Sequence, residues 1–248
     1  MRFALISDVH ANLPALEAVL GDIDARPFDA IYHLGDLVGY APWPNEVVEL
    51  VASRGIPGVA GNYESTVATS YKHCGCRYED PLQEALSHVS YAWTLAQVTP
   101  ETRRYLAALP FRLDVRAGGG HQAGEQLILV HGTPTLNTVY WTEERPAEFS
   151  LDMARRVGAR AGDVIAFGHT HRPWHRVIEG IHFVNTGSVG RPKDGDWRAS
   201  YAAVTLGAGS VEVEVLRVEY DLERAARAIR DSELPDEFAQ ILATGGTR

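Results

Sequence analysis

The chain alternates short apolar runs with segments whose apolar residues recur at helical spacing. Residues 2–7 (RFALIS) form a continuous apolar run that predicts a strand. Residues 12–25 follow with apolar positions every three or four residues, which predicts an amphipathic helix. Asn12 is a suitable N-cap for this helix, and Pro14 fits its first turn. A strand followed by such a helix is the repeating unit of an α/β fold.

The rest of the chain continues this alternation and becomes rich in strands toward its C-terminal half. Two helices are predicted between about residues 81 and 108, because Thr99-Pro100 is a helix start signal. Further strands are predicted at 29–35, 56–61, 126–130, 163–168, 172–178, 181–187, 198–206 and 211–218, and further helices at 44–53, near 150–160 and at 222–232.

The overall organisation follows from this order of elements. We expect two packed sheets with helices outside them. No internal repeat or linker interrupts the pattern, so one domain over residues 1–248 is predicted. Its last residues, 241–248, end in ATGGTR and are expected to fray.

Five of the apolar runs end in Asp, Asn or His, which are residue types that can bind metals. The endings are SDVH (7–10), LGDL (34–37), AGNY (60–63), LVHG (129–132) and FGHTH (167–171). Ligands of open α/β sheets bind beyond the carboxyl ends of the strands, and glycine there allows a sharp turn or a close approach. We therefore expect one edge of the sheet to collect Asp8, His10, Asp36, Asn62, His131, His169 and His171.

The chemistry of these side chains favours metal binding. Carboxylate, imidazole and amide oxygen suit a borderline divalent cation such as manganese, iron or zinc. In an extended segment, residues two apart face the same way, so Asp8 with His10, and His169 with His171, are expected to share a centre. The set is too large for one ion and suits two ions about 3.5–4 Å apart that share a carboxylate. Singly, the acids and Asn62 could be turn residues and His131 a core histidine, but their order and completeness favour metal.

Composition narrows the class of protein. The net charge of −9 argues against binding to duplex DNA or to an anionic membrane, either of which needs a basic face. The hydrophobic fraction of 45% is enough for a full core, and no apolar run approaches the ~20 residues of a membrane span. The opening MRFALISDVHANL is too short an apolar stretch for a signal peptide, so a cytoplasmic location is expected.

The two cysteines, Cys74 and Cys76, are too few for a disulfide framework. With His73 they could contribute to a metal or redox site, but loop thiols are the favoured interpretation. Their role stays open.

As a set, the motifs resemble the signature of the calcineurin-like metallophosphoesterase superfamily. The pattern is Asp8-x-His10, Gly35-Asp36, Gly61-Asn62, His131-Gly132 and Gly168-His169-Thr170-His171, in the order typical of that superfamily. The segments 8–20 (DVHANLPALEAVL) and 185–196 (NTGSVGRPKDGD) further resemble a bacterial phosphodiesterase branch that is often labelled diadenosine-tetraphosphatase-like. The resemblance implies a four-layer α/β/β/α sandwich, with two mixed sheets flanked by helices.

The resemblance also implies a ligand assignment. Asp8, His10 and His171 would hold one divalent ion, and Asn62, His131 and His169 the other, with Asp36 as the bridge. Manganese is the expected metal, with iron, zinc, cobalt and nickel as alternatives. The implied activity is hydrolysis of a phosphodiester or phosphomonoester by metal-activated hydroxide.

The substrate is expected to be a small phosphoester or a nucleotide. Arg191 and Lys193 lie in a Gly-rich turn and are candidate phosphate contacts, with solvated turn charges as the alternative. Asp194 and Asp196 in the same turn would repel a polyanion. The natural substrate and the oligomeric state, a homo-oligomer included, stay open.

Tyr63 departs from the family pattern. Many members carry a histidine after this Gly-Asn as a general acid for the leaving group. A phenol with an ordinary pKa of about 10 is a poorer proton donor at neutral pH than an imidazole with a pKa of about 6.5. We therefore favour a role for Tyr63 in orienting a phosphoryl oxygen or in packing over acid catalysis.

Three other functions are alternatives to a simple phosphoesterase. A dinucleotide polyphosphate (Ap4A-type) hydrolase would use the same chemistry with a longer groove. A protein-binding scaffold without turnover is disfavoured, because such a site has no reason to keep the whole ligand set. A metallo-β-lactamase type is disfavoured because His169-Thr170-His171 is followed by Arg172 and not by its H-x-H-x-D-H cluster.

Overall fold

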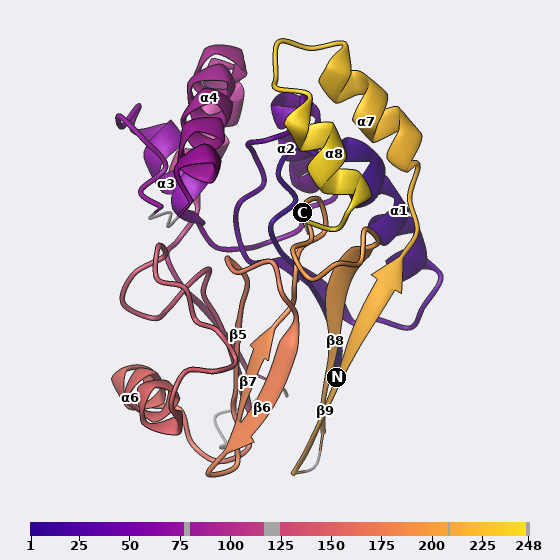
Figure 1. Ribbon diagram of the computed structural model, residues 1–248. Helices are drawn as coiled ribbons and strands as arrows, with labels where there is room; N and C mark the ends of the chain where they lie inside the picture. The colour runs from indigo at the N-terminus through magenta and orange to yellow at the C-terminus, as the bar shows by residue number, and fades with distance from the viewer. Residues whose placement is uncertain (77–79, 117–124, 208, 247–248) are drawn as a thin grey trace.

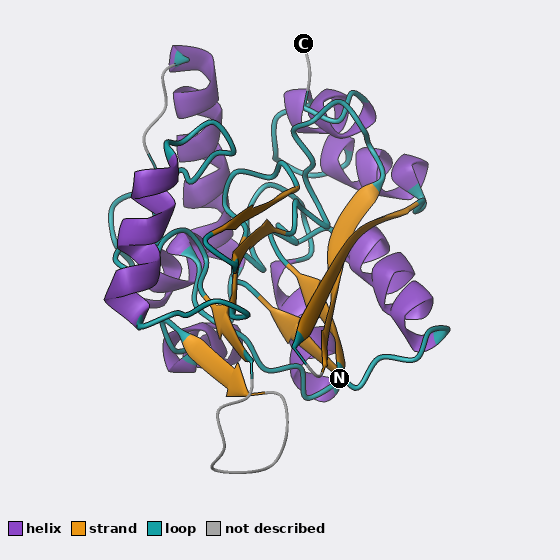
Figure 2. Cartoon of the chain, turned by 90° about the horizontal axis from the view of Figure 1, so that it is seen from below, coloured by secondary structure: helices purple, strands orange, loops and turns teal. Residues whose placement is uncertain are grey.

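Two mixed β-sheets pack face to face in the computed structural model, which describes residues 1–76, 80–116, 125–207 and 209–246. Figures 1 and 2 show helices outside both sheets. The first sheet has the order β2-β1-β8-β9 and consists of β1 (Arg2–Ile6), β2 (Ala30–His33), β8 (Ala199–Gly207) and β9 (Ser210–Val218). The second has the order β3-β4-β5-β7-β6 and consists of β3 (Leu113–Arg116), β4 (Gln126–Leu129), β5 (Val164–Phe167), β6 (Trp174–Ile178) and β7 (Ile181–Asn185). The predicted fold class is confirmed.

The apolar runs are continuous because both faces of these strands are buried. Phe3 and Leu5 of β1 pack between the sheets, together with Leu127 of β4. Ala4 and Ile6, which alternate with them, pack on the other side of the first sheet against its helices. Such strands lack the polar alternation of a half-exposed sheet.

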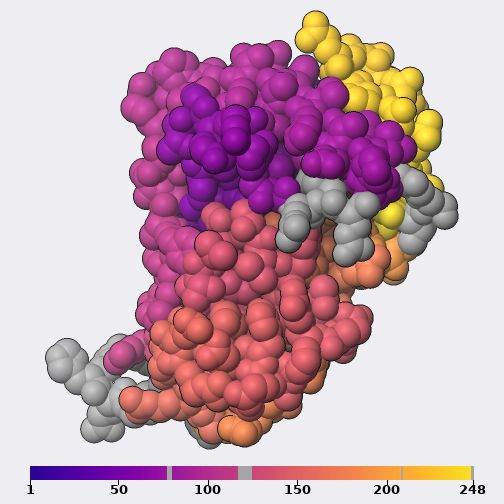
Figure 3. All heavy atoms as spheres, turned by 60° about the vertical axis from the view of Figure 1, so that its left-hand side comes forward, coloured from indigo at the N-terminus to yellow at the C-terminus, as the bar shows by residue number. Residues whose placement is uncertain are grey.

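Helices close the sandwich on both sides. The layer next to the first sheet contains α1 (Leu13–Asp24), α2 (Pro44–Ser53), α3 (Asn62–Ala68), α4 (Pro81–Gln97), α5 (Pro100–Ala108), α7 (Leu222–Arg230) and α8 (Glu237–Ala243). On the second sheet, α6 (Ala147–Val157) packs through Met153 and Ala154. Figure 3 shows one face with the α3–α5 region above and residues of the second sheet and α6 below. The predicted cap Asn12 is confirmed, since its side chain accepts a hydrogen bond from the Ala15 N–H at 3.2 Å.

Some predicted elements differ from the observed ones. The run 56–61 is not a strand: Gly58 forms an isolated bridge with His33, and Pro57 has no N–H for a longer ladder. Asn62 then begins α3, which was not predicted, and β3 was also missed. The helix expected near 150–160 begins earlier, at Ala147, and ends where Gly158 adopts a left-handed conformation with φ of 71°.

The expected fraying of residues 241–248 does not hold where the structure describes them. The unpredicted helix α8 extends to Ala243, and Leu242 is only 5% exposed. After the helix, the Gly245 carbonyl accepts a hydrogen bond from the Gly195 N–H at 3.0 Å. Burial of the apolar face of α8 and this contact order the end of the chain through Gly246. Residues 247 and 248 lie outside the described residues.

Two wider predictions are not decided by the fold. Within the ranges described above, none of the helices is long and apolar enough to cross a bilayer. A single domain and a cytoplasmic location stay predictions.

Candidate metal centre

The polar residues at the strand ends converge on one rim of the sandwich. Asp8 and His10 follow β1, Asp36 follows β2, and His131 follows β4. The remaining members come from the start of α3 (Asn62) and from the segment after β5 (His169 and His171). All seven side chains are at most 4% exposed. The structure therefore brings together every residue of the predicted set.

The backbone reaches this arrangement through left-handed turns. Asp8 and His10 have φ angles of 51° and 48°, and His169 and His171 have φ angles of 64° and 58°. The expectation that these residues lie in extended segments is therefore wrong. Asp8 and His10 nonetheless share a triad, whereas His169 and His171 belong to different triads, so the expectation that these two histidines share a centre is also wrong. A left-handed backbone costs a non-glycine residue of the order of 1–3 kcal/mol and clusters at functional sites. The rim thus carries local strain that the rest of the fold supports.

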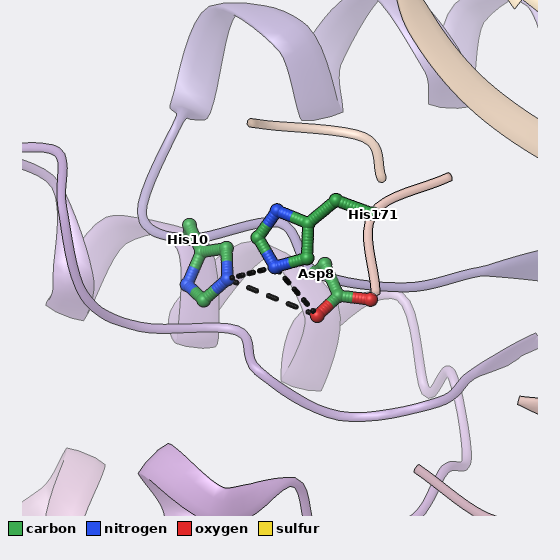
Figure 4. A group of neighbouring side chains, drawn as sticks. All are labelled: Asp8, His10 and His171. Carbon is green, nitrogen blue, oxygen red and sulfur yellow. Dashed lines mark hydrogen bonds and ion pairs between the residues drawn. The ribbon is translucent and has the colours of Figure 1, made fainter. Parts of the chain in front are cut away.

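The first triad consists of Asp8, His10 and His171 (Figure 4). The two imidazole Nε2 atoms are 3.1 Å apart. Asp8 Oδ1 lies 3.3 Å from His171 Nε2 and 3.8 Å from His10 Nε2. These atoms converge on one point, and residues far apart in the sequence supply them.

The second triad consists of Asp36, His131 and His169. His131 Nε2 lies 3.1 Å from His169 Nδ1 and 3.5 Å from Asp36 Oδ2. Asn62 joins this group, because its Oδ1 atom is 3.1 Å from His131 Nε2. Its amide nitrogen faces away and donates to the Cys74 carbonyl at 3.1 Å. The oxygen of Asn62 is therefore the atom presented to the triad.

Asp36 lies between the two triads. Its Oδ2 atom is 3.5 Å from His131 Nε2 and 3.8 Å from His10 Nε2. Its Oδ1 atom accepts a hydrogen bond from the Tyr63 N–H at 2.9 Å. Gly61 permits this approach, because a Cβ there would lie 2.2 Å from Asp36 Oδ1. Asp36 is placed where a carboxylate shared by two cations would be.

The nitrogen and oxygen atoms that converge in the first triad are hydrogen-bond acceptors, and no described residue directs a donor at them. Nδ1 of His10 lies 3.0 Å from the Val38 carbonyl, and Nδ1 of His171 lies 2.6 Å from the Arg191 carbonyl. A carbonyl only accepts, so each Nδ1 carries the proton and each Nε2 presents a lone pair. Asp8 Oδ1 is buried and has no hydrogen-bond partner among the described residues. A divalent cation fits such a cluster of lone pairs, and hydrogen bonding does not satisfy it.

The second triad also directs hydrogen-bond acceptors toward its centre. His131 Nδ1 lies 2.8 Å from the Leu34 carbonyl, which again leaves Nε2 as the acceptor facing the site. With Asn62 Oδ1 and Asp36 Oδ2 it forms a second group of oxygen and nitrogen lone pairs. The donor set of both triads suits a borderline divalent ion.

Burial and neighbouring charges shift the pKa values of the histidines in different directions. Burial, and then the neighbouring His171, lowers the pKa of His10 to about 3. Burial likewise lowers the pKa of His169 to about 3 and that of His171 well below its ordinary value. Burial opposes the charged form of His131 too, but the Asp36 carboxylate, helped by Asp8 and Glu64, raises its pKa to about 10. Without an ion, the Asp36 carboxylate therefore favours a proton at His131 Nε2, where a cation would otherwise bind.

Glu64 supports the second triad from behind. Its carboxylate accepts hydrogen bonds from the N–H groups of Asp36, Leu37 and Gly61, each at 2.7 Å. Burial, and then the Asp36 charge, raises the pKa of Glu64 to about 7. Its side chain is fully buried, so Glu64 is not a surface acid at the start of α3.

Tyr63 packs beside the site but directs its hydroxyl elsewhere. Its ring centroid is 5.6 Å from that of His10, and the residue is 1% exposed. The hydroxyl lies 3.3 Å from Ser90 Oγ, on α4. Burial raises the pKa of Tyr63 well above 10, which weakens it further as a proton donor at neutral pH. These contacts fit a packing role.

A small cavity opens beside the triads. Besides the ligand candidates, its lining includes Tyr40, Tyr63, Cys76, Tyr140 and Lys193. Tyr140 stacks on the His169 ring at a centroid distance of 4.5 Å. Burial, and then the Arg191 charge, lowers the pKa of Lys193 to about 7. Arg191 itself is 4% exposed and lines a second small cavity that shares His10 and Tyr40 with the first.

The cysteine segment contributes to the site without forming a third ion site. The Asn62 amide donates to Cys76 Sγ at 3.2 Å as well as to the Cys74 carbonyl. In the described part of the chain, the groups of three or more ligand atoms close enough for an ion are the two triads, and neither includes His73, Cys74 or Cys76.

Ser188 is a supporting residue that the sequence did not single out. Its hydroxyl donates to the Asp8 carbonyl at 2.7 Å and accepts from the Arg191 N–H at 2.8 Å. It thereby joins the segment after β1 to the loop that carries Arg191. A serine in a Gly-rich turn gives no distinct signal of this kind, because turn serines are common for local reasons.

Comparison with known proteins independently supports the interpretation of this site as a metal centre. Residues 1–209 match the model of the calcineurin-like phosphoesterase superfamily domain. An uncharacterized protein of Methanocaldococcus jannaschii is 31% identical over 98% of this chain and 97% of its own length. The crystal structure of a metallophosphoesterase from Sphaerobacter thermophilus is 32% identical, covers 99% of this chain and 100% of its own, and has a TM-score of 0.73. A hypothetical protein of Pyrococcus horikoshii shares the fold, with a TM-score of 0.82 at 24% identity over 100% of this chain and 99% of its own.

Proposed function

Because the chain belongs to the calcineurin-like phosphoesterase superfamily, we propose that it hydrolyses a phosphodiester or phosphomonoester with the help of two divalent metal ions. Asp8, His10 and His171 would hold one ion. His131, His169 and Asn62 would hold the other, and Asp36, which lies between the two groups, would be shared. Manganese is the metal we propose, because carboxylate, imidazole and amide oxygen ligands together suit it.

One observation carries this proposal: buried lone pairs converge without donors. The backbone carbonyls of Val38, Leu34 and Arg191 fix the Nδ1 protons of three histidines and aim their Nε2 atoms inward. Without cations, two Nε2 atoms at 3.1 Å would face each other as lone pairs beside the Asp8 carboxylate. Such a buried arrangement is costly unless an ion compensates it.

The protein's contribution to catalysis is to hold these groups and shield them. When bound, a pair of such ions lowers the pKa of water toward about 7 and neutralises charge on the phosphoryl oxygens. Glu64 fixes the backbone of Asp36 and Leu37, so that the shared carboxylate keeps its orientation. Tyr140 covers one face of His169 and limits access of water from that side. Lys193, at the cavity wall, is placed to donate hydrogen bonds to the substrate's phosphoryl oxygens.

The direct test is a metal-dependent assay on the full chain. Protein stripped with a chelator should lose turnover of bis(p-nitrophenyl) phosphate and regain it with Mn²⁺, and the bound metal should approach two ions per chain. p-Nitrophenyl phosphate and diadenosine tetraphosphate in the same assay distinguish monoester and dinucleotide polyphosphate hydrolysis. Two bound ions without turnover of any phosphoester would favour the scaffold alternative, and no bound metal would refute the proposal.

A further inference from the structure

The loop between β7 and β8, residues 186–198, is tied to the first triad by its backbone. The Gly190 N–H donates to the Asp8 carbonyl at 3.0 Å, and the Lys193 N–H donates to the His171 carbonyl at 3.2 Å. A Cβ at Gly190 would lie 1.7 Å from the Val9 carbonyl oxygen, so only glycine fits there. Arg191 and Lys193 are therefore carried at a fixed place beside Asp8 and His171.

The side chains of this loop remain only partly satisfied by the protein. The Arg191 guanidinium lies over the Tyr40 ring at 4.1 Å, and its terminal nitrogen donates weakly to Gln83 at 3.4 Å. Its Nε atom is buried with no hydrogen-bond partner in the described residues. Lys193 lines the same cavity as His169 and His171. Two cations thus flank the first triad with hydrogen-bonding capacity left for an anion.

The other side of this loop is covered by the C-terminal cap, which we define as residues 234–246. Phe238 of α8 meets the Tyr40 ring edge-on, at a centroid distance of 5.3 Å. The Gly195 N–H donates to the Gly245 carbonyl at 3.0 Å. A Cβ at Gly245 would lie 2.6 Å from the Asp196 nitrogen, and one at Gly246 would lie 2.7 Å from the Pro192 carbonyl oxygen. The cap therefore presses on both the ring under Arg191 and the loop around Lys193.

The cap lies in the part of the chain that follows the match to the superfamily model. The match to the superfamily model ends at residue 209, before the cap begins. Figure 1 shows α8 and the C-terminal end of the described chain beside the loops at the upper end of the sheets. Phe238 and Leu242 of the cap line a second small cavity together with His10 and Arg191.

We propose that the C-terminal cap is part of the substrate site, where it holds the 186–198 loop so that Lys193 and Arg191 present fixed cations to the anionic oxygens of the bound phosphoester. This inference rests on the proposed function. Cations that are already ordered lose less conformational entropy when the substrate binds, so the cap raises affinity without touching the ions. Gly245 is a positioning residue, because it acts through Lys193.

Gly245→Ala tests this positioning with a closely matched control. Gly245 and Gly55 have left-handed φ angles of 59° and 60°, but nothing lies within 4 Å of a Cβ at Gly55. In the Mn²⁺-loaded full chain, Gly245→Ala should weaken binding of inorganic phosphate about tenfold, as expected for a lost contact worth about 1.4 kcal/mol. KM for bis(p-nitrophenyl) phosphate should rise in parallel, while kcat and the Mn²⁺ stoichiometry stay within twofold. Gly55→Ala should change none of these values.

Lys193→Met completes the experiment as a double-mutant cycle. The single variant should lose phosphate affinity to a similar extent, and adding Gly245→Ala should cost little more, because both changes remove the same interaction. Additive losses, or unchanged phosphate affinity in Gly245→Ala, would overturn the inference. If Gly245→Ala does not fold, Phe238→Leu is judged by the same readouts. Cap-dependent phosphate binding without any turnover would refute the proposed function and leave this inference standing.

Discussion

The two triads lie side by side with Asp36 between them, and the charged groups around His171 of the first differ from those around His131 of the second. Arg191 and Lys193 flank the first triad, and their positive charges contribute to the lowered pKa of His171. Around the second triad, carboxylates dominate: Asp36, Asp8 and the buried Glu64 raise the pKa of His131 to about 10. One protein thus places similar ligands in two different potentials.

This difference indicates a division of labour between the triads. The Asp36 carboxylate beside His131 and the buried Glu64 carboxylate behind Asp36 attract a divalent cation, so the second triad should hold its ion more tightly. At the first triad, the nearby cations oppose metal binding but attract a phosphate. We therefore expect the second ion to be the anchored one and the first to face the substrate.

Asp36→Asn should cause the largest loss, because it removes the charge that both triads share. Activity should fall roughly 1,000-fold, since several kcal/mol of transition-state stabilisation depend on the ions. Asp152→Asn on the surface of α6 is the control. Loss of one ion only, with the other retained at wild-type affinity, would contradict the bridging role. Metal content and kcat/KM measure both effects.

Glu64→Gln should separate the triads. An amide cannot accept all three hydrogen bonds that the Glu64 carboxylate takes from Asp36, Leu37 and Gly61, because one of its atoms is a donor. Metal affinity at the second triad should fall about 10–100-fold, as is usual for a residue that orients a ligand. Titration with Mn²⁺ should then show two sites of more equal affinity, whereas Glu101→Gln on exposed α5 should leave the wild-type difference in place.

Tyr63→His should change catalysis at the first triad, because the Tyr63 ring packs against His10. If wild type lacks a leaving-group acid, it should cleave nitrophenolate esters readily and alkyl esters slowly, and the imidazole should raise alkyl turnover by about tenfold, at the low end for acid catalysis. Turnover plotted against leaving-group pKa measures this. A flat dependence in wild type would show that the acid is already present.

The smallest expected effect concerns the strand beneath the second triad. His33, at the end of β2, is buried with neither ring nitrogen hydrogen-bonded among the described residues, and burial lowers its pKa from 6.5 to about 3. The unfolded chain therefore takes up this proton first as pH falls. Stability from a neutral His33 is complete above about pH 6.5 and declines toward pH 3, with about 2 kcal/mol lost at pH 5.

His33→Phe should flatten this decline, whereas β1 beneath the first triad carries no such group. Unfolding of metal-free protein by urea at pH 7 and pH 5 measures it, with His88→Phe on the exposed face of α4 as the control. An equal loss of stability in His33→Phe and wild type would contradict the assignment.

The sequence predicted best the features that depend on short local patterns of residues. Runs such as RFALIS predict a strand because both faces must be apolar, and the polar endings predict the rim because parallel strands end together. The sequence did not predict the features that depend on contacts between residues distant in the chain. The left-handed turns at Asp8 and His169 depend on the surrounding fold, and α8 is ordered by packing on Tyr40 and the 186–198 loop. The burial of Glu64 also depends on Asp36, which is distant in sequence.

The central claim is that two cations occupy the two triads. A crystal of the protein grown with Mn²⁺, measured at the manganese absorption edge, tests it most directly. We predict two anomalous peaks about 3.5–4 Å apart, one among Asp8, His10 and His171 and one among Asn62, His131 and His169, with Asp36 touching both. A map without peaks at the triads, or with manganese bound only elsewhere, would contradict the account.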